Sequence, residues 1–305
     1  MDGDVVRDVL VEADVVVLQR TTHAYMAQAV GVMRAKGITV VVDVDDDLSS
    51  IHPSNPAWAA HRPGRGPHSW QNLSMACRDA SLVTASTPAL LEVYAKHGRG
   101  HVLPNYLPDH YYDLERVDSD TVGWAASFHS HPNDPEVMGG AIARLVDEGV
   151  QFVMRGDSTG AGRALGLEQD PVGGGVPIEE WPAAVASLGV GVAPLADTRF
   201  NSCKSWLKPL EMSACGVPWV GSPRAEYRRL HEMGAGLLVD NPRRWYRAVK
   251  RLHESAALRQ ELSEAGREVA GRLRLRDHWG EWMAAWQRAV ELDRAMPRQR
   301  VPAGR

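Results

Sequence analysis

The sequence of 305 residues has few cysteines and phenylalanines, and it has no long apolar run. Its three cysteines form neither an even disulfide set nor a CxxC pair, and no His/Cys cluster has the spacing of zinc ligands. No apolar run reaches the roughly 18 residues that a membrane span needs, and the N-terminus is acidic where a signal peptide is basic. We therefore expect a protein of the reducing cytoplasm with no integral membrane segment.

The sequence also lacks an excess of positive charge. Its formal net charge is −4, which gives no general attraction to nucleic acids or anionic membranes. With 44% hydrophobic and 24% charged residues, the composition is that of an ordinary globular protein with room for two domains. Three of the ten tryptophans, Trp279, Trp282 and Trp286, recur at helical spacing. We interpret them as the packing face of one helix.

The first 105 residues alternate between strand and helix patterns. Short β-branched apolar runs are typical of buried parallel strands, and the segments between them have helical spacing. The predicted strands are 13–20, 37–47, 80–88 and 100–105, and the predicted helices are 23–37, 69–78 and 89–98. This order predicts a parallel sheet with crossover helices.

A polar segment at 106–119 reads as a linker, and a second alternating series follows it. Its predicted strands are 121–127, 150–156, 190–195 and 217–222, its predicted helices are 134–149, 178–189 and 204–215, and residues 238–295 are helical, most clearly 245–262 and 277–292. We expect an α/β protein of two doubly wound, Rossmann-like domains that face a cleft. The expected parts are residues 1–115 and 116–276, then a helix and flexible tail at 277–305, with C-terminal helices packing back toward the first domain.

The segment that contains Lys208 and Glu211 carries charge into an apolar setting. The two residues are three apart, so they share one face of the predicted helix. A glutamate can accept both hydroxyls of a ribose, and a lysine beside helix N-terminal amides suits a diphosphate. A surface salt bridge, which contributes only some tenths of a kcal/mol, is the alternative.

The surrounding sequence "KPLEMSACGVPWVGS" resembles the K-x-x-E-x-x-A-x-G-x-P-x-V segment of group 1 (family 4-like) nucleotide-sugar glycosyltransferases, which have the GT-B fold. In the same order, "GWAASFHSHPND" resembles the G-W-x-G-S-x-x-H-x-x-D segment that opens their second domain, with Ala126 where glycine is commoner. "SLVTASTPALLEVY", followed by "LPN", resembles a segment of their first domain, and "VGVAPLADTRFNSCKSWLK" resembles the loop before the donor helix. The resemblance covers roughly 40–290.

This resemblance implies how the donor is bound. Glu211 would bind the nucleotide ribose, and Lys208, Lys204 and Ser205 would contact the diphosphate. One departure concerns the sugar itself. Many members carry a second glutamate eight residues before Glu211, and Cys203 occupies that position here.

The same resemblance implies further residues in the second domain. Gly123 to Ser127 would form a tight turn near the donor, and His131 would be a catalytic contact to the transferred sugar or its phosphate. Taken alone, His131 is more often a surface or capping histidine. The family's usual Arg/Lys phosphate pair after the first strand of this domain is missing, so Arg155 or Lys204 would substitute.

The acidic run "DVDDDL" ends a strand of the first domain. It is typical of a D-x-D metal site of the other major glycosyltransferase fold, but the two-domain pattern argues against that fold. Asp45 and Asp46 could instead face sugar hydroxyls across the cleft, one of them as a base, or could simply cap a helix as solvated charges. The long loop 49–70 is either a substrate flap or disordered, and four of its cations could meet an anionic acceptor: His61, Arg62, Arg65 and His68.

The favoured function is transfer of a hexosyl or related sugar from a UDP- or GDP-sugar to an acceptor hydroxyl. The resemblance implies a retaining reaction that needs no metal or other cofactor, with cations stabilising the departing diphosphate. A non-catalytic sugar-nucleotide or glycan-binding module remains an alternative, which the loss of a glutamate at Cys203 favours. A sugar-nucleotide epimerase or synthase is a third possibility. Acceptors compatible with the sequence are a glycan, a lipid-linked sugar, a protein, or DNA with hydroxymethylated bases.

Overall fold

The structure is a computed structural model that describes residues 6–61 and 68–295. Arg62, Arg65 and the tail from Met296, which carry sequence predictions, lie outside this range. The chain divides into two compact units. Unit 1 comprises Met1–Pro53, Ala57–Pro104 and Trp279–Arg305, and unit 2 comprises Ser54–Pro56 and Asn105–His278.

Unit 1 is built on a parallel sheet with the strand order β1-β2-β3-β4. Its strands are β1 (Val15–Gln19), β2 (Thr39–Val44), β3 (Leu82–Ala85) and β4 (Gly100–Val102), and its helices before residue 105 are α1 (Ala24–Ala35), α2 (Trp58–His61), α3 (Ser69–Asp79) and α4 (Pro88–Tyr94). The predicted alternation of strand and helix is confirmed here. Both β-branched runs of the sequence became strands, and β2 is buried along nearly its whole length.

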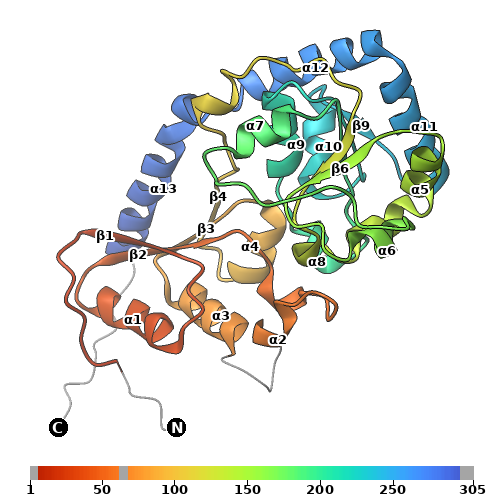
Figure 1. Cartoon of the computed structure of the whole chain (residues 1–305). Helices are drawn as coiled ribbons and strands as arrows, with labels where there is room; N and C mark the ends of the chain where they lie inside the picture. The colour runs from red at the N-terminus through yellow and green to blue at the C-terminus, as the bar shows by residue number, and fades with distance from the viewer. Residues whose placement is uncertain (1–5, 62–67, 296–305) are drawn as a thin grey trace. The chain divides into compact units, whose positions relative to one another are not determined.

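The C-terminal helix α13 (Leu275–Ala295) packs on the sheet of unit 1 from Trp279 onward. Ala285 and Ala289 lie in one core cluster with Val41 and Leu82, on the side of the sheet opposite α1 and α3 (Figure 1). Asp293 secures the end of the helix through Arg34 and Ser81. Trp282 and Trp286 pack against this core as predicted, whereas Trp279 is 62% exposed.

Unit 2 has a parallel sheet with the order β6-β5-β7-β8-β9. Its strands are β5 (Val122–Ala125), β6 (Phe152–Arg155), β7 (Val190–Ala193), β8 (Trp219–Gly221) and β9 (Leu237–Leu238), and its helices are α5 (Ala141–Asp147), α6 (Ala161–Leu165), α7 (Trp181–Ala186), α8 (Arg199–Ser202), α9 (Leu207–Ala214), α10 (Ala225–Glu232), α11 (Pro242–Glu254) and α12 (Ala256–Gly271). Because successive strand residues point to opposite faces, each face carries its own core. Trp124 and Val190 belong to one cluster, Ala125 and Ala193 to the other.

Several predicted elements of unit 2 differ from the structure. The helix expected at 134–149 is broken into a 3₁₀ helix, η4 (Asp134–Met138), and α5, because Gly139 adopts a φ of +53°. The helix expected at 245–262 is two helices, since Ser255 caps the N-terminus of α12. Helix α10 and strand β9 were not predicted from the sequence. None of the helices within the described ranges is long and apolar enough to cross a membrane.

The predicted linker at 106–119 is packed rather than extended in solvent. Tyr111 is buried in a core cluster of unit 2, and the Tyr112 hydroxyl donates a hydrogen bond to the Leu273 carbonyl. Leu107 forms a parallel bridge with Arg274. This segment therefore contributes side chains to unit 2, and one of them reaches the candidate site.

Candidate functional site

Helix α9 carries two of the predicted donor residues, Lys208 and Glu211, in its first two turns. Pro209 is the third residue of the helix, where its missing N–H falls among the amides that have no intrahelical acceptor. The helix ends before Gly216, whose φ of +75° suits a glycine. Trp206 precedes the helix and donates its indole N–H to the Asn105 carbonyl at 2.7 Å, which fixes the entry of the chain into α9.

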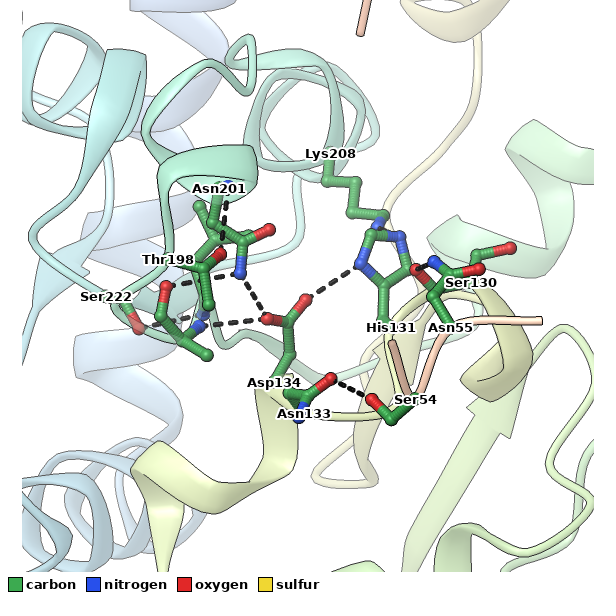
Figure 2. Close-up of polar contacts among 12 residues, drawn as sticks. Ser54, Asn55, Ser130, His131, Asn133, Asp134, Thr198, Asn201, Lys208 and Ser222 are labelled. Atoms are coloured by element: carbon green, nitrogen blue, oxygen red, sulfur yellow. Dashed lines mark hydrogen bonds and ion pairs between the residues drawn. The ribbon is translucent and has the colours of Figure 1, made fainter. Parts of the chain in front are cut away.

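Lys208 contacts His131, which lies after β5 and is 77 residues earlier in the chain. The Lys208 ammonium forms a hydrogen bond with His131 Nε2, and His131 Nδ1 lies 2.8 Å from Asp134 Oδ2 (Figure 2). His131 and Asp134 are 9% and 2% exposed. The structure therefore brings the predicted residues His131 and Lys208 together, with Asp134 behind them.

His131 is a neutral imidazole in this arrangement. Burial first, and the neighbouring Lys208 charge second, lower the pKa of His131 to about 4, although the Asp134 carboxylate opposes the shift. A neutral imidazole has one N–H and one lone pair. Because a lysine ammonium can only donate, Nε2 must accept, and Nδ1 therefore donates to Asp134.

Glu211 is buried, with an exposed fraction of 7%. Tyr111 donates its hydroxyl to Glu211 Oε1 at 2.9 Å, and Trp181 donates its indole N–H to the same oxygen at 3.1 Å. Burial raises the pKa of Glu211 to about 7, although both hydrogen bonds and Lys208 oppose the shift. Glu211 is therefore not half of a surface ion pair, and its carboxyl titrates near neutral pH.

The other predicted diphosphate residues lie between α8 and α9. Lys204 places its ammonium 4.3 Å from the centre of the Phe200 ring, and Ser205 Oγ accepts a hydrogen bond from Asn105 Nδ2 at 2.7 Å. Cys203 is 4% exposed at the C-terminus of α8. The position that holds a glutamate in many of the resembling proteins is thus a buried thiol here.

Gly123 does not form the predicted turn; it lies inside β5. A Cβ at Gly123 would stand 2.3 Å from Leu188 Cδ2, so the glycine is needed for packing against the next layer. The close backbone approach occurs after β5, where a Cβ at Gly156 would lie 2.6 Å from the Ala126 carbonyl oxygen and 2.9 Å from Ser127 N. Ser127 precedes the 3₁₀ helix η3 (Phe128–Ser130), which leads to His131.

Arg155 ends β6 and is held by helix α7. Its Nε donates to Ser187 Oγ at 3.0 Å and to the Ala184 carbonyl at 3.2 Å. It lines an open hollow of about 360 Å³ together with Met154, Val172, Gly173, Gly174, Gly175, Val176, Ala184 and Ser187. The glycine-rich segment and α7, which also carries Trp181, form the two walls of this hollow.

Asp45 and Asp46 lie in unit 1, immediately after β2. Arg20 pairs with Asp45 at 2.6 Å and approaches Asp46 at 3.5 Å, and these two carboxylates are 38% and 23% exposed. The capping residue is Asp47, which accepts hydrogen bonds from the amide and hydroxyl of Ser49. Among residues 6–61 and 68–295, no three His, Cys, Asp or Glu side chains gather as a metal site.

The described part of the loop 49–70 contributes short helices and polar contacts. His61 ends α2, and burial together with Arg20 lowers its pKa. His68 precedes α3 with a φ of 50°. Ser54 hydrogen-bonds Asn133, and Asn55 Nδ2 donates to the Ser130 carbonyl at 3.1 Å, so both contacts flank His131 in sequence (Figure 2).

Three residues of the site carried no predicted role. In the sequence, Asp134 is only the last residue of the H-x-x-D pattern, which assigns it no role. Tyr111 lies in a segment without periodicity, and Trp181 belongs to an ordinary helix pattern. No local signal could identify Tyr111 and Trp181, because they meet Glu211 of α9 across sequence separations of 100 and 30 residues.

A scan against protein-family models found no match, and a search of curated proteins found no similar sequence. A search of solved structures found matches at low identity. HepE from Anabaena, in complex with UDP and glucose, is 16% identical with a TM-score of 0.62, and the match covers 88% of this chain and 77% of HepE. TarM from S. aureus is 13% identical with a TM-score of 0.61, and the match covers 82% of this chain and 51% of TarM.

A glycosyltransferase from Rickettsia africae is 12% identical with a TM-score of 0.57, and the match covers 91% of this chain and 98% of that protein. The chain thus spans nearly all of one matched protein but only about half of TarM. These likenesses agree with the two parallel α/β sheets and confirm the fold predicted from the sequence. The chain has the GT-B fold of these glycosyltransferases.

Proposed function

We propose that the protein transfers a sugar from a nucleoside-diphosphate sugar to an acceptor hydroxyl, and that unit 2 binds the donor. The observation that carries the proposal is the pair of side-chain contacts made by two residues of α9. One turn of helix presents the Lys208 ammonium, held by His131, and the Glu211 carboxyl, held by Tyr111 and Trp181. Such an arrangement suits a ligand with a diphosphate next to a ribose.

Lys208 is the proposed diphosphate ligand. It lies in the first turn of α9, where unpaired backbone N–H groups already give a positive potential. A lysine there is unfavourable for the isolated helix, and an anion at the helix end would reverse that. Because His131 is neutral, it positions the ammonium without cancelling its charge.

Glu211 is the proposed ribose ligand. The two donors from the protein both reach Oε1. Oε2, which no donor reaches among the described residues, can accept a ribose hydroxyl, and an ionised carboxylate binds such donors about twice as strongly as a neutral acceptor. We assign the nucleobase to the hollow beside Arg155, because α7 forms one wall of that hollow and also carries Trp181.

Transfer would need electrostatic stabilisation of the departing diphosphate. We propose that Lys208, with Lys204 and Ser205 in the preceding turn, supplies it without a resident metal ion. The predicted retaining outcome and the catalytic contact of His131 to the sugar belong to the same proposal. Asp45 and Asp46 remain predicted acceptor-side residues, and the proposed acceptor is a glycan or a hydroxymethylated DNA base.

A sugar-nucleotide-binding module without transfer activity is the second candidate. The buried thiol of Cys203, at the place of a second glutamate, favours it, since a thiol cannot accept a sugar hydroxyl as a carboxylate does. Such a protein would bind the nucleotide through Lys208 and Glu211 but would lack the contact that holds the sugar.

A donor screen separates the two candidates. Thermal unfolding would be followed with UDP-, GDP- and ADP-sugars, and released diphosphate and product masses would be measured with a panel of acceptors. An enzyme gives stabilisation and diphosphate release, whereas a binding module gives stabilisation alone. Glu211→Ala should abolish donor stabilisation, and Glu232→Ala, at the exposed end of α10, should not. Unchanged donor affinity in Glu211→Ala would refute the site.

A further inference from the structure

We infer that Asp134 is a positioning residue for the proposed donor site: its carboxylate fixes the ring of His131, so that Nε2 faces and holds the Lys208 ammonium. The inference rests on the proposed function for its effect on the donor. Its effect on the histidine ring can be measured without any ligand.

The carboxylate of Asp134 has a donor on each oxygen. Oδ2 accepts from His131 Nδ1 at 2.8 Å, and Oδ1 accepts from the amide of Ala196 at 2.9 Å and from Asn201 Nδ2 at 2.6 Å (Figure 2). Two N–H donors of fixed direction meet on Oδ1 of a side chain that is 2% exposed, which favours the ionised carboxylate, and such a group can only accept at Oδ2 as well. Asp134 is therefore a fixed anion, and the direction of each hydrogen bond is determined.

The direction of these bonds determines the tautomer of His131. With Asp134 as acceptor, the ring hydrogen lies on Nδ1, and Nε2 keeps its lone pair. A lysine ammonium has only N–H donors, so it can bond this tautomer and not the other. The chain of bonds thus runs from Asp134 through His131 to Lys208, and each bond depends on the one before it.

Asp134 also connects this chain to the loop that precedes α9. Ala196 follows β7, and Asn201 lies in α8, where its amide additionally donates to the Ala196 carbonyl at 3.2 Å. The Asn201 backbone N–H donates a hydrogen bond to the side-chain oxygen of Thr198, which caps α8. One carboxylate therefore positions the histidine and anchors the segment that leads to Lys204 and Ser205.

A double-mutant cycle with UDP as the probe tests the inference. Asp134→Asn should weaken UDP binding about tenfold and lower kcat about 100-fold, because an asparagine can satisfy either His131 or the two loop donors but not all three. In a Lys208→Met background, Asp134→Asn should change the Kd for UDP less than twofold, since its effect passes through Lys208. Additive effects in the cycle would overturn the inference. Glu136→Gln, two residues along and exposed, is the matched control and should leave UDP binding unchanged.

Nitrogen spectra of ¹⁵N-histidine-labelled protein give the second readout. The wild type should show His131 with hydrogen on Nδ1 and a bare Nε2, and a wild-type spectrum with hydrogen on Nε2 would refute the inference whatever the activity. If the wild type shows the expected ring but binds no nucleotide, the proposed function fails and the positioning of the ring stands.

A second variant serves if Asp134→Asn does not fold. His131→Phe keeps a planar ring and removes both nitrogens while Asp134 stays in place. It should weaken UDP binding to the same extent as Asp134→Asn is expected to. A folded His131→Phe protein with unchanged UDP affinity would also overturn the inference.

Discussion

The two units each place carboxylates after a parallel strand or on a neighbouring helix, but in opposite environments. In unit 1, Asp45 and Asp46 are partly exposed and share Arg20. In unit 2, Asp134 and Glu211 are buried and are bonded by His131, Tyr111 and Trp181 among others. The acidic run that is conspicuous in the sequence, Asp45 and Asp46, is therefore the more exposed of the two sets of carboxylates.

This difference shows how burial controls what a carboxylate can do. A buried charge is costly unless every bond is made, so each partner of Asp134 and Glu211 is strongly determined. An exposed pair such as Arg20 and Asp45 gains little, because water solvates both groups. We expect substitutions in unit 2 to change ligand binding far more than those at the acidic end of β2.

Removal of the Lys208 charge should have the largest effect. Lys208→Met should weaken UDP binding about 100-fold, because truncation of one partner of a hydrogen-bonded charge pair that the ligand would bury costs about 2–5 kcal/mol. Isothermal titration calorimetry measures this directly. Arg20→Met in unit 1 and Lys250→Met at a surface ion pair are the matched controls and should stay within twofold. Equal losses in all three variants would remove the distinction between the units.

The pH dependence of donor binding should follow Glu211. Burial raises the pKa of Glu211 to about 7, so the carboxyl is half protonated at neutral pH, and only the ionised form presents an Oε2 without hydrogen to the ribose. Affinity for UDP-glucose, whose phosphates do not titrate near pH 7, should fall about tenfold from pH 8 to pH 6. Glu211→Gln should bind weakly at both values. A wild-type affinity that does not change over this range would contradict the raised pKa.

The free energy of unfolding of unit 2 should depend on pH through the titration of His131. Its folded pKa of about 4 lies below its ordinary value of 6.5, so the unfolded chain binds more protons between these values and stability is lost as pH falls through them. Glu211, whose pKa is raised from 4.5 to about 7, acts in the opposite direction over much of this window. Urea unfolding of the wild type and His131→Gln isolates the histidine. The difference in unfolding free energy should grow by up to about 3 kcal/mol from pH 4 to pH 6.5.

The smallest effect on binding is expected at Asp45. Asp45→Asn removes one carboxylate of an exposed pair and should change the unfolding free energy by less than about 1 kcal/mol. UDP affinity should not change, because Asp45 belongs to unit 1. If Asp45 is an acceptor-side residue, transfer falls while donor hydrolysis persists. A tenfold loss of UDP affinity would show that the exposed carboxylate belongs to the donor site.

Much of the fold could be predicted because buried parallel strands are short apolar runs. Residues 39–44 and 122–125 show this pattern without any help from distant residues. Two short elements were not predicted. Strand β9 has only two residues, and helix α10 has three arginines or histidines in its last five positions, so its apolar pattern is too weak to indicate a buried face. The break at Gly139 was also hidden, because a glycine pair inside a helical pattern does not reveal its φ.

Lys208, Glu211 and His131 were predicted from the motifs that resemble those of the glycosyltransferases, because the three-residue spacing of Lys208 and Glu211 suits a surface ion pair equally well. The turn assigned to Gly123 was wrong, because a glycine needed for close packing and a glycine needed for a turn look alike in sequence. The structure instead gives that close approach to Gly156, more than 30 residues further on.

The sequence by itself determined the alternating α/β order, the GT-B fold and the helix that bears the two charged residues. Only the tertiary structure decided what those charges contact. Tyr111 comes from the supposed linker and Trp181 from α7, and both converge on Glu211. His131 and Asp134 come from the segment after β5 and reach Lys208. Local spacing governs secondary structure, whereas the pKa of a buried group depends on neighbours that are distant along the chain.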